Sequence, residues 1–157
     1  MKISGTATIA GAPPERVYEL LQDPAVLAKC MPGCDELVRT GENEYEMRMK
    51  LMIASLSGLF DGKVRLSDHE PPRAFQMQVD GKGKVGFMKG QGSIGLAPNS
   101  SGTEVAYDGD VQLGGTIAAV GSRLVDTTSK MILKRFFDKL SSIAASDPKA
   151  GEAGVGS

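Results

Sequence analysis

The chain has 157 residues, of which 18 are basic and 19 are acidic, so its formal net charge is −1, and 41% of its residues are hydrophobic. This length favours a single domain with an ordinary core, and the balanced charge gives no general attraction to nucleic acid. No run of apolar residues is long enough to span a membrane, and the first residues lack the apolar core of a signal peptide. We therefore expect a cytoplasmic protein with free thiols.

The chain is expected to begin with a strand and two short helices. From residue 2 to residue 10, apolar or small residues alternate with polar ones, which is the period of a half-buried strand. Pro13 and Pro14 then stand where the first turn of a helix tolerates proline. Asp23-Pro24 ends this helix, and Asp23 can cap a second helix that continues to about Lys29.

A series of antiparallel strands is predicted next, over residues 35–40, 44–53, 60–66, 75–79, 81–95 and 105–113. Alternation is clearest in the second of them, where Tyr45, Met47 and Met49 point to one side and charged residues to the other. The segment from Gly81 to Gly95 is rich in glycine, which indicates sharply curved strands with bulges.

One long amphipathic helix is expected from about Thr116 to Ala145, and at ~1.5 Å per residue it would be about 45 Å long. We expect one domain over residues 1–146 and a disordered tail over residues 147–157. The fold class is therefore α+β, with a curved antiparallel sheet of about seven strands around a long C-terminal helix. The apolar face assigned to that helix consists of Ile117, Val120, Leu124, Thr128, Met131, Phe136, Leu140 and Ile143.

This order of elements resembles the helix-grip fold of the START/Bet v 1-like superfamily. Within it, several segments look like the G-subunit family of carbon monoxide dehydrogenase, over about residues 1–145. The resemblance implies an accessory protein of molybdenum-containing hydroxylases, linked to membrane recruitment of the enzyme and, for some members, to quinone binding. The segments are Asp23-Pro24, Cys30-Met31-Pro32-Gly33-Cys34, Gly58 to Asp68 with Pro71-Pro72, and Gly121-Ser122-Arg123-Leu124.

The sequence offers no convincing catalytic set, so we expect a protein that is not an enzyme and that holds neither a cofactor nor a metal. His69 is the only histidine and is interpreted as a surface loop residue. Cys30 and Cys34 are too far apart for a thioredoxin-like pair and lack further soft ligands, which favours a structural turn over a thiol-linked contact with a partner.

The inner face of the sheet is expected to be wider than one helix can cover, and the chain has no Trp to fill the remainder. This predicts an apolar cavity for a hydrophobic ligand such as a quinone or an acyl lipid. Tyr107 could offer its hydroxyl to a carbonyl group of that ligand. The cavity residues predicted are Met47, Met49, Phe75, Met77, Val105 and Tyr107 from the sheet, and Leu124, Thr128 and Met131 from the helix.

Two other interpretations remain open from the sequence. A filled core would favour a membrane-recruitment or assembly factor that acts through protein contacts, and a weaker alternative is an enzyme of the same superfamily. The basic residues Lys130, Lys134, Arg135 and Lys139 either stabilise the end of the helix or meet an acidic partner or anionic headgroups at the inner membrane face. The expected partners are thus a hydrophobic small molecule, a molybdenum hydroxylase and the membrane surface, but not nucleic acid.

Overall fold

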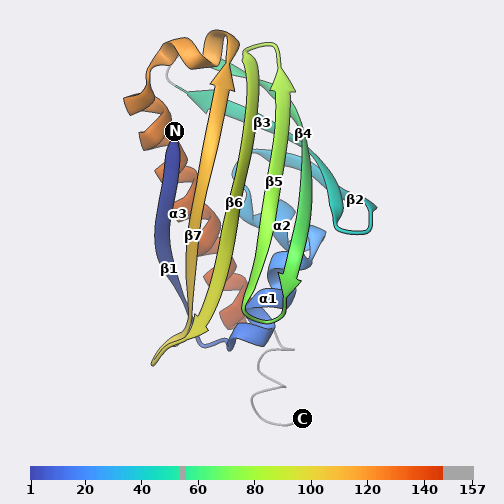
Figure 1. Cartoon of the computed structure of the whole chain (residues 1–157), viewed down its shortest axis with the longest axis vertical. Helices are drawn as coiled ribbons and strands as arrows, with labels where there is room; N and C mark the ends of the chain where they lie inside the picture. Colours follow the sequence, from blue (N-terminus) through green and yellow to red (C-terminus); the bar gives the residue numbers. More distant parts are fainter. Residues whose placement is uncertain (54–55, 147–157) are drawn as a thin grey trace.

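The computed structural model describes residues 1–53 and 56–146. Within them the chain forms one seven-stranded antiparallel sheet with the strand order β1-β7-β6-β5-β4-β3-β2 (Figure 1). The first and last strands are therefore neighbours, and β2 lies at the opposite edge. The strands are β1 (Lys2–Ala10), β2 (Cys34–Gly41), β3 (Glu44–Ile53), β4 (Leu56–Glu70), β5 (Ala74–Gly83), β6 (Gly86–Pro98) and β7 (Gly102–Gly114).

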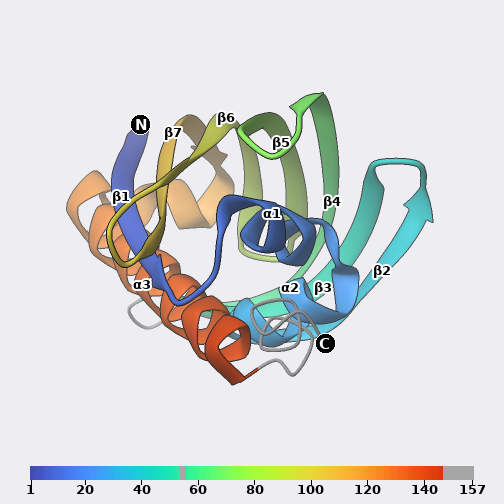
Figure 2. The same cartoon turned by 90° about the horizontal axis from the view of Figure 1, so that it is seen from below.

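The two short helices after β1 are confirmed. They are α1 (Pro14–Gln22) and α2 (Pro24–Cys30), and each begins with a proline in its first turn. The Asp23 carboxylate accepts a hydrogen bond of 2.9 Å from the Ala25 backbone N–H, so Asp23 caps α2 as expected. The predicted helix-grip fold is confirmed as well, since the curved sheet holds a long C-terminal helix, α3 (Ser122–Ser146) (Figure 2).

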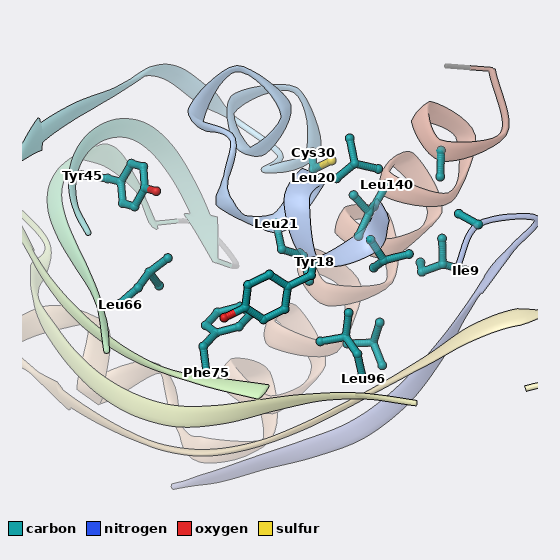
Figure 3. Packing of buried hydrophobic residues seen from close by; sticks show 14 residues of the cluster. Ile9, Tyr18, Leu20, Leu21, Cys30, Tyr45, Leu66, Phe75, Leu96 and Leu140 are labelled. Carbon is teal, nitrogen blue, oxygen red and sulfur yellow. The ribbon is translucent and has the colours of Figure 1, made fainter. Parts of the chain in front are cut away.

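The core is divided into two clusters. The larger, here the α1 cluster, joins α1, α2 and the end of α3 to the nearby strands (Figure 3). The smaller, here the η1 cluster, lies beside a short 3₁₀ helix, η1 (Gly115–Val120). The η1 cluster is Met47, Met49, Phe60 and Ile117. The α1 cluster is Ile9, Ala12, Val17, Tyr18, Leu20, Leu21, Cys30, Tyr45, Leu66, Phe75, Leu96, Val105, Leu140 and Ala144.

The long helix begins later than the sequence predicts. Residues 115–120 form η1, and Gly121 then adopts a φ of +94°, so the α-helix begins only at Ser122. This break changes which residues of α3 face the sheet. Leu124 and Met131, predicted to face inward, are 45% and 42% exposed, because Val125 and Leu140 define the buried face and both residues lie almost opposite to it.

The glycine-rich segment contains no bulge, because β5 and β6 pair without a register shift from Ala74↔Gly95 to Gly83↔Gly86. The tail predicted over residues 147–157 lies outside the described residues, and the extent of the single domain stays a prediction.

The phase of β3 can be tested by placing a carboxylate on each of its faces. Met49 is 8% exposed within the η1 cluster, whereas the next residue, Lys50, is exposed on the other face. We expect Met49→Asp to lower the free energy of unfolding by about 3 kcal/mol or more, because an unpaired carboxylate would be buried. Lys50→Asp should change it by less than about 0.5 kcal/mol. Equal effects in urea unfolding would show that the strand phase is wrong.

Candidate functional site

Between the two clusters, part of the inner surface is apolar but only partly covered. On the sheet it comprises Val79 of β5, Met88 of β6 and Val111 of β7, which are all half-buried. On α3, Ile132 and Leu133 are half-buried too, and Val125 is buried. Among the described residues, neither cluster includes these side chains. We call these six residues the central band.

The central band remains partly open because of how α3 packs. The helix lies mainly along β1 and also contacts α1, α2 and the inner side of β3, rather than crossing the middle of the sheet (Figure 2). The strands that face α3 also lack side chains at this point, since Gly92 and Gly109 are paired across β6 and β7. A Cβ atom on either glycine would lie 2.8 Å from a backbone oxygen of the other strand, so these strands approach closely where side chains are missing.

Tyr107 marks the end of the band next to the α1 cluster. Its ring stacks on Phe137 of α3, with 5.5 Å between centroids and 15° between planes. The same ring covers Gly5 of β1, where a Cβ atom would lie 2.5 Å from the Tyr107 hydroxyl oxygen. Within the described part of the chain this hydroxyl makes no hydrogen bond, so it keeps its capacity to donate one.

The nine predicted cavity residues do not come together as one set. Met47 and Met49 belong to the η1 cluster, and Phe75 and Val105 to the α1 cluster. Met77, Tyr107 and Thr128 are half-buried. Leu124 and Met131, which were predicted to line the cavity, instead lie exposed on the outer face of α3. The lining role of the other seven stays a prediction.

Sequence reasoning missed the helical half of the band. Val125 and Ile132 lie seven residues apart, which is a helical repeat visible in the sequence, and Leu133 follows directly. It was overlooked because the repeat was started at Ile117, on the other side of the break. The alternation of β5 and β7 already contained Val79 and Val111, but nothing in it distinguished a partly covered position from a filled one.

A pocket of about 410 Å³ opens at the η1 end of the central band. It contains two residues of the band, Val111 and Val125, together with Leu113 from the inner face of β7. The rest of its wall comes from the chain terminus, the β5–β6 turn region and the junction between η1 and α3. These further lining residues are Met1, Phe87, Gln112, Ala118, Gly121 and Ser122.

A larger hollow, of about 740 Å³, lies over the outer face of β2 to β6 and is lined mostly by charged residues. The charges alternate in sign across the strands, because Glu46 pairs with Lys63 and Lys63 pairs with Asp80. The neighbouring row alternates as well, and Arg48 lies 3.2 Å from Asp61. Each charge thus has an opposite neighbour, so this face offers no net charge for a ligand.

His69 is not the loop residue that the sequence suggested. It lies half-buried near the end of β4, with Nδ1 2.8 Å from the Tyr18 hydroxyl and Nε2 3.0 Å from Asn43 Oδ1. Its ring also stacks on Phe75. Burial, followed by the nearby carboxylate of Glu70, raises the pKa of Tyr18. Both ring nitrogens of His69 thus have hydrogen-bond partners, Tyr18 and Asn43, and these contacts join α1 to the strands.

The two cysteines lie in different surroundings. Cys30 is 2% exposed in the α1 cluster, and burial raises the pKa of its thiol to about 11. Cys34 is half-buried, and burial also raises its pKa. A raised pKa disfavours the nucleophilic thiolate. In the described residues no group of three or more His, Cys, Asp or Glu side chains could hold a metal ion.

Comparison with known families adds to this geometry. The model of the CoxG family, the G subunit of carbon monoxide dehydrogenase, matches residues 5–145. The chain belongs to this family. No curated protein matches the sequence. Membership of the CoxG family agrees with the resemblance found in the sequence segments.

Solved structures agree on the fold. A conserved protein from Geobacillus kaustophilus is 31% identical, with a TM-score of 0.87 over 92% of this chain and 95% of that one. A START superfamily protein from Mycobacterium smegmatis is 15% identical, with a TM-score of 0.67 over 90% and 94% of the two chains. Ara h 8.0201 is 9% identical, with a TM-score of 0.65 over 94% and 99%. The described part of the chain contains no helix long and apolar enough to cross a membrane.

Because the Tyr107 ring lies over Gly5, adding a methyl group at residue 5 should destabilise the fold. Gly5→Ala should lower the free energy of unfolding by about 1–3 kcal/mol, because the new Cβ atom displaces the ring from Phe137. The control is Gly95→Ala, where the nearest atom is 3.9 Å away and little should change. In a Tyr107→Leu background Gly5→Ala should cost much less. An equal cost in both backgrounds, measured in urea, would contradict this placement of the ring.

The raised pKa of Cys30 predicts a loss of stability in alkali. Its thiol ionises near pH 9 when unfolded and near pH 11 when folded. The stabilisation is therefore complete below pH 9 and is lost as the pH rises towards 11. Under reducing conditions, the stability advantage of the wild type over Cys30→Ala should shrink across this range. A constant difference between the two proteins would argue against a buried, protonated thiol.

Proposed function

We propose that this protein is a non-enzymatic accessory protein of a carbon monoxide dehydrogenase-like molybdenum hydroxylase system, and that it carries a hydrophobic ligand between α3 and the sheet. The observation that supports this proposal is the central band. Its side chains point into the molecule, yet most of them are only half-buried and neither core cluster includes them. An apolar ligand would bury them and gain about 25 cal/mol for each Å² removed from water.

The lining of the band indicates the class of ligand. The side chains are Val, Ile, Leu and Met, which favour an apolar chain or ring and offer no charge. Tyr107 adds one hydroxyl at the end of the band next to the α1 cluster, so a ligand with a carbonyl oxygen can bind with that oxygen either here or at the opposite end of the band. A quinone combines both features, and an acyl lipid is the other ligand that fits them.

The proposed enzyme partner is supported by the family. The CoxG family takes its name from a component of carbon monoxide dehydrogenase, so a ligand carrier in this family would serve that enzyme. A quinone in turn resides in the membrane, so the proposal includes peripheral contact of this protein with the inner membrane face. The central band would then exchange its ligand between the bilayer and the enzyme.

A second candidate, a recruitment or assembly factor, is favoured by one observation. The outward face of β3 carries charged residues as far as Lys50 and then changes to Met52, which is 63% exposed. Leu59, opposite Lys50 on β4, is 58% exposed. Large apolar side chains exposed together at the end of a hairpin are typical of a docking surface.

The carrier function predicts stabilisation by ligand. Ubiquinone or menaquinone analogues with a short isoprenoid chain, or long-chain fatty acids, should raise the melting temperature with concentration, as binding to the folded state alone requires. The effect should be measured by differential scanning fluorimetry on protein from which bound lipid has been extracted. Native mass spectrometry of the protein before extraction should detect the ligand that it carries.

A matched pair of variants locates the binding surface. Gly90 lies on the inner face, opposite Val79 and Val111, and a Cβ atom there would make only ordinary van der Waals contacts. Gly90→Phe should fill the band and abolish the melting shift, whereas Gln91→Phe, on the outer face, should preserve it. No shift in the wild type with any of these ligands would reject the carrier function and leave the recruitment factor.

A further inference from the structure

We propose that the pocket at the junction of η1 and α3 is the portal of the central band, and that it holds the polar end of an amphiphilic ligand whose apolar chain lies along the band. This inference rests on the proposed carrier function. It adds three points to that function: a second part of the binding site, the route by which the ligand enters and leaves, and the orientation of the bound ligand.

The pocket joins the inner surface to the outside. Val111 and Val125 belong both to the pocket and to the central band. Phe87 and Gln112, in contrast, are exposed and belong to the outer face of the sheet. A pocket lined by residues of both faces passes around the end of the sheet. At the opposite end α1, α2 and the end of α3 pack against the strands, and the α1 cluster fills the interior there (Figure 3).

One side of the pocket comes from the end of η1 and the start of α3, where Ala118, Gly121 and Ser122 line it, and η1 itself contacts β6, β7 and α3. Ile117, 1% exposed, is its buried residue, and the Ile117 N–H donates a 2.7 Å hydrogen bond to the Val85 carbonyl. On both sides of this attachment the backbone has a left-handed conformation, at Gly115 with φ +78° and at Gly121 with φ +94°. Ala118, between the attachment and Gly121, lines the pocket and is exposed.

The lining of the pocket determines the direction of the ligand. Its inner part is Val111, Leu113 and Val125, which suit an apolar chain. Two further lining residues, Gln112 and Ser122, are exposed and carry an amide and a hydroxyl, which can form hydrogen bonds with a polar group that stays in contact with water. A ligand with one polar end and one apolar chain matches this order, and its chain would extend towards Tyr107.

The rates of ligand association and dissociation test whether the ligand passes through the pocket. Ala118→Trp should narrow the pocket and slow both association and dissociation of a fluorescent long-chain fatty acid by about tenfold or more. Because the indole also takes space at the polar end of the ligand, the association rate should fall more than the dissociation rate, so the affinity should fall as well. The control is Ala119→Trp, because Ala119 is also exposed but does not line the pocket. Both rates should be measured by stopped flow, and thermal unfolding should verify that each variant is folded.

Quenching of tryptophan fluorescence by a brominated ligand tests the orientation of the ligand. The chain contains no Trp, so a single introduced Trp is the only reporter. One reporter is Gln112→Trp at the pocket, and the other is Phe137→Trp, which stacks beside Tyr107 at the far end of the band. The probe is hexadecanoate brominated either beside its carboxylate or at the far end of its chain. The first bromine should quench Gln112→Trp more strongly, and the second should quench Phe137→Trp more strongly.

The outcomes separate this inference from the proposed function. If neither bromine quenches Phe137→Trp and no ligand stabilises the protein, the carrier function itself is wrong and the portal is rejected with it. If Phe137→Trp is quenched but Ala118→Trp exchanges ligand as fast as Ala119→Trp, the carrier function stands and the portal is overturned. Equal or reversed quenching of the two reporters would overturn the proposed direction.

Discussion

The structure depends on a mismatch between the width of its sheet and the width of a single helix. A seven-stranded curved sheet presents an inner face that one helix of about 10–12 Å diameter cannot cover. Because α3 lies along β1, α1 and α2 must cover one end of this face and η1 the other. The middle is left with half-covered apolar side chains, and this remainder is the candidate site.

Stability and function are thereby assigned to different parts of one interior. The two clusters contain nearly all of the buried apolar side chains, so most of the hydrophobic stabilisation arises at the ends of the molecule. Each cluster connects strands to a helix. The central band can then remain partly exposed without unfolding the protein, although its exposed apolar surface costs free energy that a ligand would recover.

The sequence was informative for the strands and misleading for the helix, for a geometrical reason. Side chains of a strand alternate with a period of two, so β3 shows its inward face, including Tyr45 and Met49, without any reference point. The buried face of a helix can be assigned only relative to a residue known to lie on it. The prediction used Ile117 as that residue, but the backbone at Gly121 breaks the helical repeat between Ile117 and α3. Leu124 and Met131 were therefore assigned to the wrong face. The site could be predicted only in part, because whether Met47 or Val79 meets a ligand depends on which strands α3 leaves uncovered.

The two candidate functions converge on one end of the molecule. The outer face of the sheet neutralises its own charges, so it gives a partner little reason to bind there. Met49 and Phe60 belong to the η1 cluster, and Met52 and Leu59 stand next to them in β3 and β4 but point outward. The exposed apolar side chains and the pocket thus both lie at the η1 end. Under the proposed function, a membrane or enzyme docked there would meet the proposed portal, so recruitment and ligand transfer would use the same surface rather than compete.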